Sequence, residues 1–192
     1  ARLDHTRLLR YAGLFTWAMV GIPLLYSWFL STPTVLNDQP LEIEPMHWYG
    51  WACYGAFGVS YAWLTRGLGA RRAGILDLIL LLVLTGSAVG VSYYSVSGLG
   101  SVLLMVAACV LPWLLPIAAG IAWLVLSQFA VVPMFVRGLH FPLVEAMMQS
   151  LLYAGFSGFV FVTSLVARQQ AQAREEQRRL NSELRATRAL LA

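Results

Sequence analysis

The side chains best suited to do chemistry gather near one predicted membrane boundary. Arg137, His140, Glu145 and Gln149 lie within one short stretch, and His47 begins another apolar segment expected on the same side. Imidazole and carboxylate groups bind protons and metal ions, and histidine titrates near physiological pH. These five residues are therefore a candidate sensing site for a proton, a metal ion or a polar ligand.

A simpler interpretation of the same residues is an ion pair between Glu145 and Arg137 at the membrane surface, beside two interfacial histidines. No fixed-spacing motif supports a metal site, so we expect neither a metal nor a cofactor in these residues. Asp77 is a second acid near a membrane boundary, and Arg71 or Arg72 is its expected partner.

Catalytic signatures are missing from the sequence. It contains no GxSxG, GxxxxGK[ST] or HExxH motif, and the stretch 98–100 is expected to be a turn between helices. Cys53 and Cys109 lie in apolar stretches without the CxxC spacing of a zinc site, so we expect both to be packing residues. We therefore predict no catalytic residue in this chain.

Composition places the chain in a membrane. Of its 192 residues, 59% are hydrophobic and only 11% are charged, whereas soluble domains carry about 25% charged residues. Apolar runs of membrane-spanning length are bounded by charge, glycine or proline. They predict six transmembrane helices, at residues 9–30, 46–65, 74–95, 99–115, 117–136 and 142–167. Pro112 and Pro116 should separate the fourth from the fifth.

Charge orients these spans. All 13 basic residues are arginines, and they concentrate in the N-terminal segment, the second loop and the C-terminal tail, whereas the first loop, STPTVLNDQPLEIEP, carries only acids. The positive-inside rule therefore predicts both termini in the cytoplasm of a bacterial inner-membrane protein, with Arg137 as one exception. Because the arginines flank apolar spans, the net charge of +4 reflects membrane orientation and not nucleic-acid binding.

The C-terminal residues 168–192 contain no glycine or proline and are rich in strong helix formers. The last span should therefore continue as one helix into the cytoplasm, and because no helix-ending residue follows, we expect the chain to be truncated. The a and d positions of a heptad pattern are Gln170, Ala173, Gln177, Leu180, Leu184, Thr187 and Leu191. They predict a dimeric coiled coil that is weak near the membrane. The alternative is a lone solvated helix.

The segment 180–192, LNSELRATRALLA, resembles the linker before the dimerisation and phosphoacceptor helix of DesK-like sensor histidine kinases. Residues 107–128, AACVLPWLLPIAAGIAWLVLSQ, are similar to the family's membrane region, where a proline-flanked turn joins two late spans. The resemblance implies an input module for a kinase core outside this chain. That core would use ATP and Mg²⁺, phosphorylate itself on a histidine and serve a response regulator. His5, His47 and His140 do not inherit the phosphoacceptor role.

We therefore expect an all-α integral membrane protein with two parts, a six-helix transmembrane sensor domain at residues 1–167 and a cytoplasmic linker helix at 168–192. Its expected partners are a second copy of the chain and membrane lipids, and its expected stimulus is a membrane property or a ligand at the outer face. The alternative function is a small transporter or channel subunit. Its polar path would be lined by Asp77, Gln128, Glu145 and Gln149.

Overall fold

The structure is a computed structural model that describes residues 5–29, 34–36, 39–41, 46–68 and 73–192, with only the backbone described for 34–36 and 39–41. The described helices are α1 (His5–Phe29), α2 (Trp48–Leu64), α3 (Ile75–Ser95), α4 (Leu99–Ala108), α5 (Leu111–Leu114), α6 (Ile117–Phe129), α7 (Val132–Arg137) and α8 (Leu143–Leu191). Two short strands, β1 (Thr34–Leu36) and β2 (Gln39–Leu41), pair antiparallel between α1 and α2.

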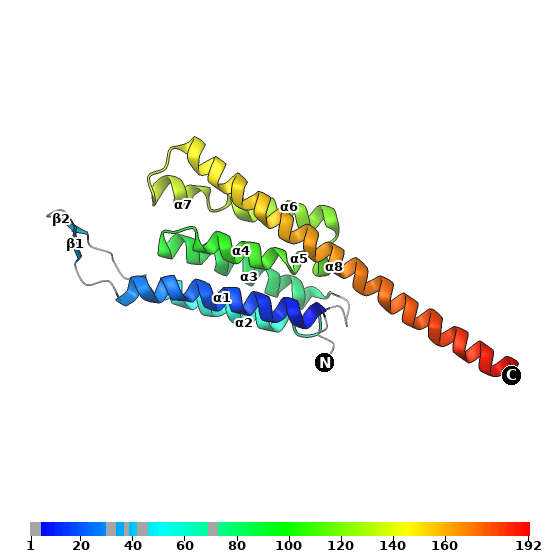
Figure 1. The fold of residues 1–192 in the computed structure, drawn as a ribbon. Helices are drawn as coiled ribbons and strands as arrows, with labels where there is room; N and C mark the ends of the chain where they lie inside the picture. Colours follow the sequence, from blue (N-terminus) through cyan, green and yellow to red (C-terminus); the bar gives the residue numbers. More distant parts are fainter. Residues whose placement is uncertain (1–4, 30–33, 37–38, 42–45, 69–72) are drawn as a thin grey trace.

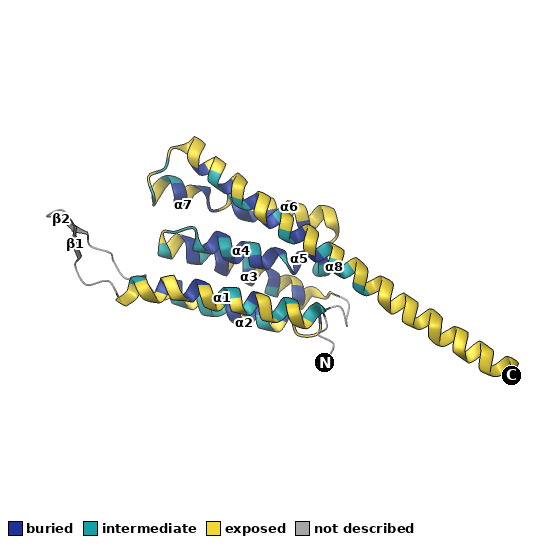
Figure 2. Cartoon of the chain, in the orientation of Figure 1, coloured by how far each residue is buried: buried dark blue, intermediate teal, exposed yellow. Residues whose placement is uncertain are grey.

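The helices pack side by side in a bundle, and the second half of α8 projects from it (Figure 1). α4 lies at the centre, because it contacts α1, α3, α5, α6 and α8. Its residues explain the position: Leu103 and Ala108 are fully buried, and the whole helix is apolar apart from one buried serine. A helix that is hydrophobic on every face is stable only when it is surrounded. Figure 2 shows this buried centre between exposed outer faces.

α1 and α2 are joined by their aromatic side chains. The Tyr61 hydroxyl donates to the Leu9 carbonyl at 2.8 Å, and the Tyr54 hydroxyl donates to the Trp17 carbonyl at 2.7 Å. The Trp17 indole N–H returns a hydrogen bond to the Tyr54 carbonyl at 3.0 Å, and the two rings stack with centroids 4.7 Å apart. Polar atoms on apolar rings therefore find partners inside the bundle, as a lipid environment requires.

Within the described residues, four helical segments are long and apolar enough to cross a membrane: α1, α3, α6 together with α7, and the first part of α8. This confirms the helical, membrane-type fold that the composition predicts. α2 has 17 residues and α4 only 10. The expected span at 99–115 is therefore not one continuous helix, which corrects the sequence prediction.

The chain breaks at the predicted boundary, at Leu115 and Pro116 between α5 and α6, and also earlier, inside the expected span. α4 ends at Ala108, where the N–H groups of Cys109 and Val110 turn back to carbonyls three residues before them. Pro112 causes this, because its ring clashes with the carbonyl four residues earlier and it has no N–H to donate. Another interruption separates α6 from α7 just before Pro133.

Gly100 marks the tightest helix crossing in the centre of the bundle. A Cβ at this position would lie 2.2 Å from the Ala88 carbonyl oxygen of α3, whereas a Cβ at Gly86 would meet nothing within 4 Å. We therefore expect Gly100→Ala to lower the free energy of unfolding by about 1–3 kcal/mol. Gly86→Ala, the matched control, should be neutral or stabilising by about 0.5–1 kcal/mol.

Unfolding both variants in detergent measures these changes. Equal stability of the two proteins would mean that α4 does not pack as closely on α3 as described.

Candidate functional site

The five residues of the predicted outer site do not bond to one another. His47 is exposed at the start of α2, where its Nδ1 accepts a hydrogen bond from the Tyr49 N–H at 3.4 Å and its ring stacks on the Tyr49 ring with centroids 4.8 Å apart. Figure 1 shows the start of α8 across the bundle from α2. His47 is therefore explained as a helix-capping, interfacial side chain.

The other four residues lie where α7 passes into α8. Arg137 ends α7, His140 has a φ of 56° in the connection, and Glu145 lies in the first turn of α8; all three are exposed, and Gln149 is half-buried. The structure records no hydrogen bond or ion pair between any two of the five, and the described residues contain no metal-binding group of three or more His, Cys, Asp or Glu. The ligand site therefore stays a prediction.

Asp77 and Glu145 share a structural role that the sequence already signals. Each is the third residue of its helix, and the Asp77 carboxylate accepts a hydrogen bond from the Gly74 N–H at 3.0 Å. A negative charge in the first helical turn is favoured by the helix dipole. Both acids are therefore explained by helix starts, while Arg71 and Arg72, the expected partners of Asp77, lie outside the described residues.

The residues that the structure brings together lie on the inner face of α8. Ala146, Ser150, Ala154 and Ser157 are buried on this face, and α8 contacts α4 and α6. Small side chains let helix backbones approach closely in a membrane. This face of small residues is thus used for packing within the chain.

Gln128 connects three helices in the buried centre. Its side chain is 1% exposed, and its Nε2 donates to the Ser101 carbonyl of α4 at 3.3 Å and to the Ser157 hydroxyl of α8 at 2.8 Å. The sequence suggested Gln128 as part of a polar path. The structure places it as a bridge from α6 to α4 and α8.

A second set of hydrogen bonds holds α8 at the other end of the bundle. Ser164 accepts from the Trp113 indole N–H at 3.1 Å and donates to the Cys109 carbonyl, and the Arg168 guanidinium donates to the Pro112 carbonyl. The sequence did not predict the partners of Ser164 and Arg168. The available signal was the seven-residue spacing of Ser150, Ser157 and Ser164, which puts three hydroxyls on one helix face.

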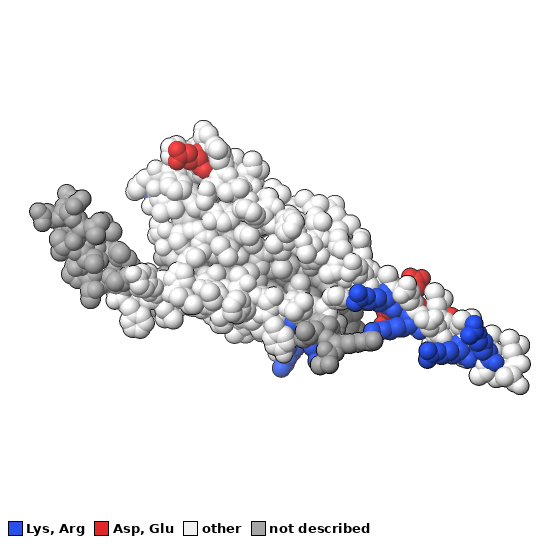
Figure 3. All heavy atoms as spheres, in the orientation of Figure 1, with Lys and Arg blue, Asp and Glu red and all other residues white. Residues whose placement is uncertain are grey.

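Beyond this point α8 runs past the start of α1. The Arg174 guanidinium donates to Nε2 of His5 at 2.8 Å, so α1 begins at the end of the bundle where the tail leaves it. Arginine side chains gather over the tail and the neighbouring end of the bundle, and the surface beside them is largely uncharged (Figure 3). This is the arrangement of a membrane-embedded body with one basic end.

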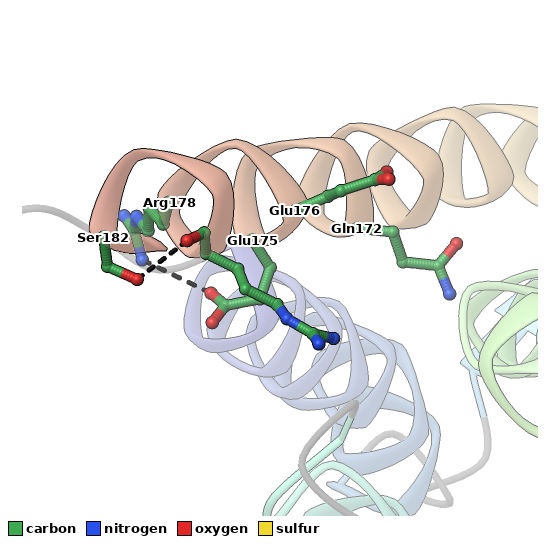
Figure 4. Close-up of a pocket in the computed structure, with 6 residues that line it drawn as sticks. Gln172, Glu175, Glu176, Arg178 and Ser182 are labelled. Atoms are coloured by element: carbon green, nitrogen blue, oxygen red, sulfur yellow. Dashed lines mark hydrogen bonds and ion pairs between the residues drawn. The ribbon is translucent and has the colours of Figure 1, made fainter. Parts of the chain in front are cut away.

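The tail itself is one unbroken helix and is exposed from residue 172 onward, which confirms the predicted continuation of the last span (Figure 2). One of its faces is polar. Figure 4 shows Glu175, Arg178 and Ser182 there, with an Arg178–Glu175 ion pair at 3.7 Å. Solvent-exposed ion pairs of this kind contribute little stability. The polar face is therefore a solvated surface.

The other face of the tail is apolar. Leu180, Leu184 and Leu191 are 57%, 52% and 84% exposed. At about 100° per residue, the heptad positions from Val166 to Leu191 lie about 140–240° around the helix from Ser164, the residue that faces the bundle. The predicted seam therefore points away from the bundle and is free in this single chain.

Comparisons of the chain with protein-family models, with curated proteins and with solved structures find no match. No relative therefore assigns a role to any of these residues.

Gln128 and Ser157 should be energetically coupled, because replacing either one removes the buried hydrogen bond between them. We expect a double-mutant cycle of Gln128→Met and Ser157→Ala to give a coupling of about 0.5–1.5 kcal/mol in the free energy of unfolding. Ser127 supplies the control: its hydroxyl bonds to Leu124 within α6, so Ser127→Ala and Ser157→Ala should be additive. Additivity of the first pair would argue against the bridge.

Proposed function

We propose that this chain is the sensory input module of a membrane histidine kinase and acts as a homodimer. The observation that supports it most is the continuity of α8. One helix packs against the membrane bundle along its first half and then carries an exposed apolar seam away from it. A change in the packing of the bundle therefore has a direct covalent route to the tail.

The proposal includes six membrane crossings. The 17 residues of α2 span about 26 Å, at the lower limit for a transmembrane helix. α4 and α5 would form a broken crossing, which a membrane tolerates when the irregular backbone is buried in protein. Buried Leu103, Ala108 and Val110 meet that condition.

Both termini are proposed to lie in the cytoplasm of a bacterial inner membrane. The contact between His5 and Arg174 supports a common side for the start of α1 and the tail, and described arginines at 7, 10, 66 and 168 belong to that end of the bundle by their helix positions. Arg2, Arg71, Arg72 and the acids Asp38, Glu42 and Glu44 lie outside the described residues, so their part of the charge pattern remains a sequence expectation.

Topology can be tested with single cysteines in a Cys53→Ala, Cys109→Ala background. In intact cells, a membrane-impermeant maleimide should label His140→Cys in the α7–α8 connection but not Gln172→Cys in the tail. Gln172→Cys should react once the cells are opened. Labelling of Gln172→Cys in intact cells would indicate an exported tail and would contradict the proposed orientation.

The stimulus is proposed to be bilayer thickness or order, read by the bundle, with a ligand at the outer face as the alternative input. A stimulus shifts a two-state equilibrium only if it interacts differently with the two states. Hydrophobic mismatch does so when the states differ in tilt or span length. Glutamine at seam positions 170 and 177 keeps the membrane-proximal coiled coil weak, so repacking there costs little free energy.

The output is proposed to be a kinase core joined to the tail. The resemblance of residues 180–192 to the DesK-like linker supports this, and in that case ATP and Mg²⁺ bind the core and a response regulator is its partner. The transporter alternative has less support. Asp77 and Glu145 lie at helix starts, and Gln128 is hydrogen-bonded between helices.

The seam is tested by charge substitution. Leu184→Asp should weaken dimerisation by about tenfold or more, because a carboxylate would replace a leucine that the proposed dimer buries. Ala186→Asp, two residues on and about 200° around the helix, should have little effect. Chemical crosslinking in membranes, by a reagent that does not form disulfides, measures the fraction of dimer. In a fusion to an active kinase core, only Leu184→Asp should also abolish the response of phosphorylation to temperature. Equal behaviour of both variants would remove the seam from the proposal.

A further inference from the structure

Pro112 and Pro116 deprive the backbone of two donors at the end of the bundle where α8 leaves it. In an α-helix, the carbonyl of each residue accepts from the N–H four residues later. The backbone is extended at Leu115, with φ −122° and ψ 153°, and Pro116 has no N–H, so the Pro112 carbonyl has no helical partner. The Trp113 N–H turns to the Val110 carbonyl at 3.1 Å, and this leaves the Cys109 carbonyl without its helical partner as well.

α8 supplies a donor to each of these two carbonyls. The Ser164 hydroxyl donates to the Cys109 carbonyl, and the Arg168 guanidinium donates to the Pro112 carbonyl. The two side chains are four residues apart and therefore lie on one face of α8. The Trp113 indole N–H completes the set with its hydrogen bond to the Ser164 hydroxyl at 3.1 Å.

The other proline break is satisfied from elsewhere. At the break beside Pro133, the Met134 N–H bonds to the Val131 carbonyl at 3.0 Å, and this leaves the Ala130 carbonyl without its helical partner. The Tyr93 hydroxyl of α3 donates to that carbonyl at 2.8 Å. The bundle thus satisfies freed carbonyls with side chains from neighbouring helices, and at the α4–α5 break those side chains come from α8.

We propose that Ser164 and Arg168 form a clasp on the proline-freed carbonyls of Cys109 and Pro112, and that this clasp fixes the rotation and depth at which α8 leaves the bundle. Both are positioning residues. Arginine suits the second position because its apolar stem crosses the membrane boundary while its guanidinium keeps a fixed charge and several donors. Breaking the clasp in lipid would leave a buried carbonyl unpaired.

The clasp rests on the proposed function only for its consequence in signalling. α4 contacts most of the bundle and is continuous in the chain with α5, so a shift of the centre would reach the tail through these two hydrogen bonds. The attachment itself is a property of this chain and can be measured without a kinase.

The test uses the full chain in lipid nanodiscs, with spin labels at positions 118 and 172 in a Cys53→Ala, Cys109→Ala background. Arg168→Met should broaden the narrow distance distribution between the labels. Arg168→Lys, which keeps a donor, should restore the narrow distribution, and Arg178→Met should not change it, because Arg178 pairs only with Glu175 of the same helix.

A narrow distribution in Arg168→Met, equal to that of the parent protein, would overturn the proposal.

Ser164 gives a second, independent arm. Ser164→Ala should broaden the same distribution, whereas Ser164→Thr, which keeps the hydroxyl, should not. If the clasp is intact but phosphorylation by a kinase fusion does not change with temperature, the proposed function is contradicted and the clasp is not.

Discussion

A backbone carbonyl in lipid must find a donor inside the protein, and this requirement governs how the bundle is assembled. Pro112 and Pro133 each remove a donor where a helix is interrupted, whereas Pro23 lies inside the unbroken α1. The freed carbonyls then accept from side chains of other helices, among them Tyr93, Ser164 and Arg168. The interruptions therefore become the places where helices distant in sequence are joined.

α8 divides its surface between two tasks. Its inner face is small and hydroxyl-bearing, so it packs closely on α4 and α6 and bonds to Gln128 and to the α4–α5 break. Its outer face is apolar through the membrane and keeps leucine at three positions of the exposed tail. Because the two faces lie on opposite sides, a second chain can pair with the tail without displacing the bundle contacts.

Helix type and the length of α8 follow from local properties that a sequence carries. The apolar runs predict a helical membrane protein, and the lack of glycine and proline after residue 166 predicts an unbroken helix to Leu191. The partners of Ser164, Arg168 and Gln128 depend on which helices meet, and the composition of the chain does not predict those contacts. The early end of α4 at Ala108 follows from Pro112, whereas the donors that satisfy the freed carbonyls come from α8. The shared position of Asp77 and Glu145 in a first helical turn could have been recognised from sequence alone.

The length of α8 also determines how far its end moves when the helix pivots. Its 49 residues form a rod about 74 Å long, of which about 35 Å extends from Arg168 to Leu191. A pivot of about 10° at Arg168 would move the far end sideways by about 6 Å, slightly more than the pitch of one helical turn. Under the proposed function, a small pivot at Arg168 would thus reach Leu191 as a displacement the size of a helix turn.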